Sequence, residues 1–147
     1  MSLLEHLQTE RELQQVLATY ARLCDERDWA LCDAVFAPQS SAEYGGWPLP
    51  DRDAILAMLR RHLGGCGPTQ HLLGNLLVEH GPQGLHSRIS VRAAHRGSRE
   101  LADLTYECLG EYHDRWVRTP QGWRILHRRM VITLELGSRQ VLRPAIG

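Results

Sequence analysis

The stretch YARLCDERDW, residues 20–29, carries a tyrosine and two aspartates at the end of an apolar helix. Upstream of this end, apolar residues recur every three or four positions, as on the buried face of a helix. These positions are Leu13, Val16, Leu17, Tyr20 and Cys24. The spacing predicts an amphipathic helix over residues 3–24 and places Asp25 at the edge of its apolar face.

Two further helices and a short strand are expected before residue 69. Residues 28–36 predict a short helix that Asp28 caps and that the proline and serines of APQSS end. We expect Trp29 to pack against this helix. SSAEYGG, residues 40–46, predicts a brief strand and a glycine turn, and AILAMLRRHL, residues 54–63, predicts a third helix.

The second half of the chain is mostly extended. Turn formers in HGPQG, RGS and TPQG separate four segments, a spacing typical of long antiparallel hairpins. The segments are residues 69–80, 85–96, 100–118 and 123–136. Helices followed by strands indicate an α+β fold in which the helices cover one face of a curved, mostly antiparallel sheet.

Length and charge limit the classes of protein that fit. A chain of 147 residues has the size of one domain, so we expect a single domain over residues 1–147. Seventeen basic residues balance seventeen acidic ones without a basic stripe, which argues against a nucleic-acid partner. The first residues do not resemble a signal peptide and no apolar run reaches 18 residues, so we expect a cytoplasmic protein without a membrane partner.

The spacing of the reactive side chains indicates neither a metal nor a cofactor. The four cysteines form no CxxC motif, and we expect reduced, mostly buried thiols. The histidines form neither HxxxH nor HExxH, and GGCGP lacks the lysine of a phosphate loop.

The order of these elements and two motifs, YxxxxDxxDW and TQHLLGN, resemble the nuclear transport factor two-like superfamily and, more narrowly, its SnoaL-like branch. The resemblance covers about residues 13–136. It implies a cone-shaped sheet that the N-terminal helices wrap around one deep pocket. Within it the sequence resembles scytalone dehydratase, bile acid dehydratase and hexachlorocyclohexane dehydrochlorinase. The superfamily also contains isomerases, polyketide cyclases and non-catalytic subunits, so the fold leaves the function open.

Asp25 and His71 are the main candidates for catalysis. From composition alone Asp25 is a solvated helix end, because acids are rarely buried unpaired. The resemblance instead implies that Asp25 pairs with a pocket histidine, the one in TQH, which is His71. An imidazole titrates near neutral pH and suits proton transfer. We expect four other histidines at the surface, near helix starts, turns and hairpin ends: His6, His80, His95 and His113.

Tyr20 and Arg128 complete the predicted site. Tyr20 is either a core residue bonded to backbone or, as the family dehydratases imply, a donor to a substrate oxygen. Arg128 matches a cavity-facing arginine of the family. Strand alternation places Arg128 on one face and His127 and Arg129 on the other without showing which face is inside, so these two remain alternatives.

Several other side chains keep two readings. Tyr44 and Trp47 flank the glycine turn and either line the pocket mouth or cover the core. One of three residues in the third extended segment is expected to reach the cone, and alternation does not say which. The three are Glu107, Glu111 and Tyr112.

These residues, with the roles that the resemblance implies for them, predict a cofactor-free lyase of the dehydratase type. His71, oriented by Asp25, would remove a proton, while Tyr20 and Arg128 stabilise charge on oxygen. The expected substrate is small, largely apolar and oxygenated. An isomerase or polyketide cyclase is the alternative in the same pocket, and the rival class is a non-catalytic small-molecule-binding or interaction subunit. The resemblance implies a homodimer or homo-oligomer through the sheet face.

Overall fold

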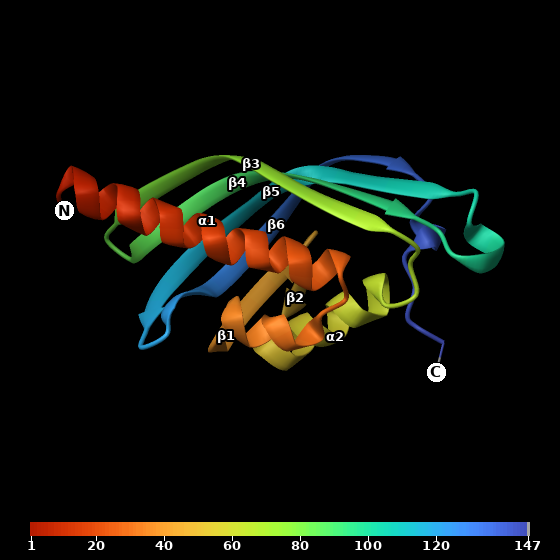
Figure 1. The fold of residues 1–147 in the computed structure, drawn as a ribbon, viewed down its shortest axis with the longest axis horizontal. Coiled ribbons are helices and arrows are strands. Elements are labelled where there is room, and N and C mark those ends of the chain that lie inside the picture. The colour runs from red at the N-terminus through yellow and green to blue at the C-terminus, as the bar shows by residue number, and fades with distance from the viewer. Residues whose placement is uncertain (147) are drawn as a thin grey trace.

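The computed structural model describes residues 1–146, in which helices lie against a six-stranded curved sheet (Figure 1). The elements in chain order are α1 (Leu3–Asp25), η1 (Trp29–Ala34), β1 (Phe36–Tyr44), β2 (Trp47–Leu49), α2 (Arg52–Leu63), β3 (Thr69–Gly81), β4 (Gly84–Arg96), η2 (Arg99–Leu101), β5 (Thr105–Thr119), β6 (Gly122–Gly137) and η3 (Arg139–Val141). Figure 1 shows α1 beneath the arched strands β3–β6 and α2 close to β1 and β2.

The sheet is mostly antiparallel, with strand order β2-β1-β6-β5-β4-β3. Only the pair of β1 and β6 is parallel within the described chain, and the other four pairs are antiparallel. The sheet curves but does not close into a barrel. The expected α+β class and curved, mostly antiparallel sheet are therefore confirmed.

Helix α1 follows the predicted apolar stripe and ends at Asp25. Ser2 and Glu5 form a capping box, in which each side chain accepts a hydrogen bond from the backbone N–H of the other residue. Leu13 and Leu17 are buried on the side of the core. The helix thus delivers Asp25 to the start of β3, where His71 lies.

The region after α1 differs from the prediction in two ways. Asp28 precedes the 3₁₀-helix, but its side chain makes no capping hydrogen bond, so the predicted cap is wrong. Pro38 does not separate a helix from a strand, because β1 already begins at Phe36. Pro38 and Gln39 are exposed at a register shift between Phe36 and Ser41, where a proline removes no ladder hydrogen bond.

The third extended segment also begins later than predicted. Residues Arg99–Leu101 form a 3₁₀ turn, and β5 starts only at Thr105. The other three extended segments agree closely with β3, β4 and β6.

A bulge in β6 explains why alternation could not orient the last strand. Trp116 pairs with Ile125 while Arg115 pairs with His127, so Leu126 is the extra residue. As a result Ile125 and Arg128, three residues apart, are both fully buried.

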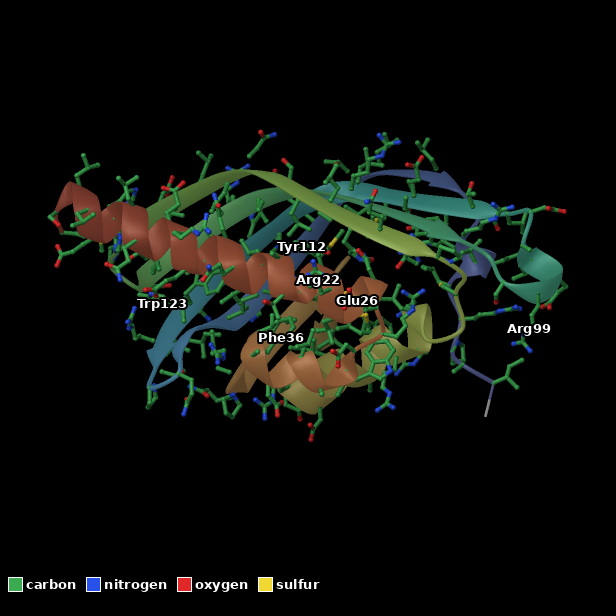
Figure 2. All side chains as sticks on the ribbon, viewed as in Figure 1. Arg22, Glu26, Phe36, Arg99, Tyr112 and Trp123 are labelled. Carbon is green, nitrogen blue, oxygen red and sulfur yellow. The ribbon has the colours of Figure 1, made fainter. Side chains whose placement is uncertain are left out.

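The core fills the space between the sheet and the helices. Phe36 and Tyr112 belong to this core, and both are buried (Figure 2). The four cysteines are free, and three of them are buried, as expected. No helix among residues 1–146 has the length and apolar character needed to cross a membrane.

Candidate active site

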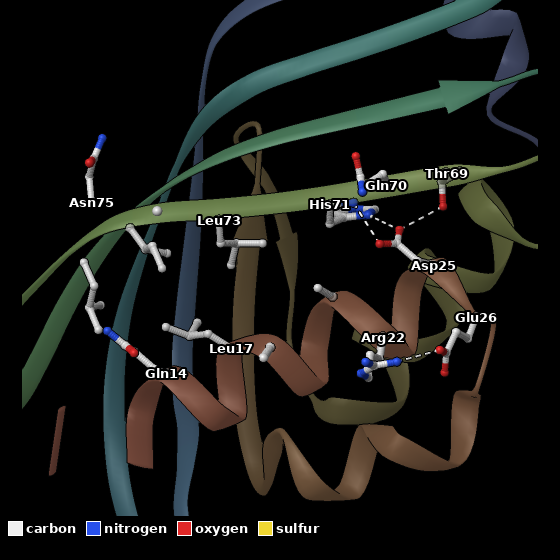
Figure 3. A pocket seen from close by; sticks show the side chains of 15 residues that line it. Gln14, Leu17, Arg22, Asp25, Glu26, Thr69, Gln70, His71, Leu73 and Asn75 are labelled. Carbon is white, nitrogen blue, oxygen red and sulfur yellow. Dashed lines mark hydrogen bonds and ion pairs between the residues drawn. The ribbon is translucent and has the colours of Figure 1, made fainter. Parts of the chain in front are cut away.

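Two hollows meet at His71. A cavity of about 830 Å³ is walled by the β1–β2 hairpin, α2 and the inner faces of β3–β6. A separate groove of about 660 Å³ runs between α1 and β3 (Figure 3). His71 lines both hollows, whereas Asp25 lines only the groove. The Asp25–His71 pair therefore lies in the wall between the two.

The structure brings Asp25 and His71 into direct contact. The Nδ1 of His71 lies 2.7 Å from Oδ1 of Asp25, and the backbone N–H of His71 donates to Oδ2 over 2.8 Å. The hydroxyl of Thr69 donates to Oδ1 over 2.9 Å, and Figure 3 shows both residues converging on the carboxylate. The side chain of His71 is only 6% exposed. This geometry fixes the imidazole from one side.

The hydrogen bonds keep the Asp25 carboxylate charged. Burial acts to raise the pKa of Asp25, but the bonds from His71 and Thr69 and the electrostatic effect of His71 outweigh it, so the pKa lies below its ordinary value. An ionised carboxylate only accepts hydrogen bonds, so Nδ1 of His71 carries the proton. In a neutral ring with this tautomer, Nε2 carries the lone pair, on the ring edge away from Asp25, and can act as a base.

Tyr20 and Tyr44 form a hydroxyl pair at the cavity wall. Their oxygen atoms lie 2.8 Å apart, so Tyr20 is bonded to another side chain rather than to backbone. Both residues line the cavity. Of the two places considered for Tyr44, the pocket or a cover over the core, the structure therefore shows the pocket. Burial raises the pKa of each phenol, so both remain protonated donors at neutral pH. One hydroxyl bonds the other, which leaves one O–H for a ligand.

Trp47 and the three candidates in β5 take distinct positions. Trp47 lines the cavity mouth and is 69% exposed. Of the three candidates in β5 only Tyr112 lines the cavity. Glu107 and Glu111 lie on the outer face of the sheet and pair there with arginines of β4.

Arg128 lies behind the cavity wall rather than in it. It is fully buried and donates through Nε and Nη2 to the two oxygens of Asp114, each over 2.8 Å. Its guanidinium stacks 3.8 Å from the centre of the Tyr112 ring and 4.3 Å from that of Tyr20. Arg128 is buried on the inner side of the sheet, but the tyrosines separate its guanidinium from the cavity, so it does not take the cavity-facing place that the resemblance implies.

The two alternatives to Arg128 lie elsewhere. Arg129 is exposed on β6 and lines the cavity edge, 3.9 Å from Glu43. His127 bonds Ser41 through Nδ1 over 2.7 Å and lines a hollow other than the cavity. Neither Arg129 nor His127 stacks on the Tyr20 ring, as the guanidinium of Arg128 does.

His95 is a cavity residue, and its predicted place at the surface is wrong. It is 6% exposed, and its ring centre lies 5.8 Å from that of His71. Its Nδ1 bonds the backbone carbonyl of Tyr106 over 3.0 Å. Burial lowers the pKa of His95 to about 4, so the ring is neutral at pH 7, with Nε2 as an acceptor.

The alternation of β4 contained the signal that identifies His95. Leu85, Ile89, Val91 and Ala93 are all buried, and His95 continues this odd-numbered series. Continuing this alternation by two residues beyond Ala93 predicts that the His95 side chain faces the inside. Within residues 1–146 no three histidine, cysteine, aspartate or glutamate side chains are grouped so as to hold a metal ion.

Comparison with known proteins agrees with this architecture. A nuclear transport factor 2-like superfamily protein of Salmonella enterica aligns with a TM-score of 0.73 at 15% identity, covering 88% of this chain and 94% of that one. A Novosphingobium aromaticivorans protein provisionally assigned as a scytalone dehydratase aligns with a TM-score of 0.79 at 20% identity, covering 97% and 95%. At these identities the likeness concerns the fold.

The family follows from the sequence match. Residues 5–129 match the SnoaL-like domain, and the chain belongs to this family. An uncharacterized protein of Mycobacterium tuberculosis is 31% identical over 129 residues, which span 80% of each chain.

Proposed function

We propose that the protein is a cofactor-free lyase of the dehydratase type. The observation that carries this proposal is the Asp25–His71 pair, whose imidazole is held at 2.7 Å by a charged carboxylate and borders the cavity. A pocket that only binds ligands needs no oriented base. The fold shared with a protein provisionally assigned as a scytalone dehydratase supports the same reaction class.

In the proposed reaction, Nε2 of His71 removes a proton from a carbon next to a carbonyl group. The electron pair moves onto the carbonyl oxygen, which accepts a hydrogen bond from the Tyr20–Tyr44 hydroxyl pair. The pair then returns to form the carbon–carbon double bond as the neighbouring C–OH bond breaks. The leaving hydroxide takes the proton back from His71 and departs as water. Asp25 stabilises the imidazolium between these two steps.

His95 and Arg128 contribute without transferring the proton. The neutral Nε2 of His95 is an acceptor for a substrate hydroxyl, which would orient the leaving group near His71. The charge of Arg128 lies under the rings of Tyr20 and Tyr112 and favours negative charge developing on an oxygen above them.

The cavity walls indicate the class of substrate. Apolar side chains from α2, β4 and β6 surround the polar groups: Met58, Leu59, Ala93, Met130 and Ile132. A volume of about 830 Å³ suits one small molecule. We therefore propose a small, largely apolar hydroxy-ketone. An isomerase or cyclase would share the first proton abstraction and differ only in where the electrons go.

A ligand screen followed by a turnover assay tests the proposal. Cyclic hydroxy-ketones that raise the melting temperature would be incubated with the protein, and a product lighter by one water would be sought by mass spectrometry. His71→Ala should bind the same compounds but release no water. Binding without conversion by the unchanged protein would refute the lyase and support the non-catalytic binder, and a product of unchanged mass would support the isomerase or cyclase.

A further inference from the structure

Arg27 occupies an unusual place directly behind the catalytic pair. It follows α1 by two residues and has a φ of 55°, a left-handed conformation that is unfavourable for a residue with a side chain. Such a conformation persists only where the surrounding contacts impose it. The contacts of the guanidinium provide that reason.

The guanidinium of Arg27 ties together four parts of the chain. Nη1 donates to the carbonyls of Cys24 and Asp25 at the end of α1, over 2.7 and 3.1 Å. Nε donates to the carbonyl of Leu63 at the end of α2, and Nη2 donates to Gly67 in the following loop. Arg27 forms no ion pair within residues 1–146, so oxygen acceptors alone satisfy its charge.

The remaining contact leads to the catalytic pair. Nη1 of Arg27 also donates to the hydroxyl oxygen of Thr69 over 2.8 Å, and that hydroxyl lies 2.9 Å from Oδ1 of Asp25. Arginine cannot accept a hydrogen bond and an ionised carboxylate cannot donate one. The hydroxyl of Thr69 therefore has a single orientation, in which its O–H points toward Oδ1 of Asp25 and donates to it.

We propose that Arg27 is a positioning residue of this site, which acts through Thr69 to hold the Asp25 carboxylate in place against His71. The chain of hydrogen bonds runs from Arg27 to Thr69, then to Asp25, where it meets the bond from His71. Without Arg27 the hydroxyl of Thr69 is free to turn toward other acceptors. Asp25 then loses a fixed donor, although Thr69 itself is unchanged.

The titration of Asp25 reports on this chain of bonds independently of any substrate. The charged and titratable groups around Asp25 are the buried thiol of Cys24 beside it, Arg27 beyond the same helix end, His71 and His95 on β3 and β4, and the exposed Arg22–Glu26 ion pair in the groove. The hydrogen bond from Thr69 favours the ionised carboxylate, so its loss should raise the pKa of Asp25.

Two variants of Thr69 separate the hydroxyl from the shape of the side chain. Thr69→Val keeps the shape and should raise the pKa of Asp25, measured by carboxyl carbon NMR. Thr69→Ser keeps the hydroxyl and should titrate as the unchanged protein. An Asp25 titration that is identical in Thr69→Val and the unchanged protein would overturn the proposal.

A double-mutant cycle then tests Arg27 itself. Arg27→Asn keeps a residue that tolerates positive φ but is too short to reach Thr69, and it should raise the pKa of Asp25. Combining it with Thr69→Val should raise the pKa of Asp25 no further than Thr69→Val alone, since both changes interrupt the same chain of hydrogen bonds. Arg22→Asn removes a nearby exposed charge and should leave the titration unchanged. Additive effects, or an Arg22→Asn shift as large as that of Arg27→Asn, would show that Arg27 acts by charge or general packing and would overturn the proposal.

The effect on turnover rests on the proposed function. There Thr69→Val should lower kcat by about tenfold, the size expected for one lost hydrogen bond to a charged group, with KM little changed. If no compound is converted, the titrations still decide the role of Arg27, so the two proposals can fail separately.

Discussion

The ion pair of Asp114 and Arg128 offers the sharpest test of the energetics of this fold. Both side chains are fully buried, and two hydrogen bonds of 2.8 Å join them. Asp114→Asn preserves the size of the side chain but removes its charge, which leaves a buried guanidinium without an anion. Breaking a buried pair in this way costs about 3–5 kcal/mol.

That loss is large for a domain of this size. The free energy of unfolding of such a domain is roughly 5–15 kcal/mol, so the variant loses a substantial part of it. With a shift of about 2–4 °C per kcal/mol, the melting temperature should fall by roughly 6–20 °C. The stacking of Arg128 on Tyr112 and Tyr20 still stabilises the cation after its anion is removed and favours the lower part of this range.

Urea unfolding followed by circular dichroism measures the change. Glu111→Gln is the matched control, because Glu111 lies on the same strand three residues earlier and pairs with Arg88 on the exposed face. It should change the unfolding midpoint little, since exposed pairs are screened by water. The double variant Asp114→Leu/Arg128→Met should recover most of the lost stability. An Asp114→Asn midpoint no lower than that of the control would refute the reasoning.

Three further predictions concern the pH response, the tyrosine pair and the assembly. The pKa of His95 in the folded protein, about 4, lies below the ordinary 6.5, so as the pH drops through this window the unfolded chain takes up a proton first and the free energy of unfolding falls. His95→Gln should make that fall smaller. A free energy of unfolding with the same pH dependence in the variant would contradict the burial argument. Tyr20→Phe should raise the activation free energy of turnover by at most roughly 2.7–4 kcal/mol, the contribution of one oxyanion donor. An unchanged rate with lower stability would instead make Tyr20 a core residue. We also expect a homodimer through the outer sheet face, which light scattering after size exclusion would disprove by finding only monomer.

The sequence by itself determined those features that depend on local periodicity. The stripe from Leu13 to Cys24 predicts α1 because buried positions on a helix repeat every three to four residues. The strands of the second half were predicted from the turn-forming residues that separate them. Asp25 and His71 were named from motifs, and their contact then depends on a helix end meeting a strand start.

Only the tertiary structure decided the parts of the site that depend on register. A single extra residue, Leu126, turns Arg128 inward toward Asp114, and no period in the strand shows where a bulge falls. Arg27 reads as an ordinary charged residue in the sequence, yet its acceptors lie on four separate segments. Interactions of this kind arise from how distant segments pack together, because the free energy of a hydrogen bond or ion pair depends on burial and partners that only the folded chain supplies.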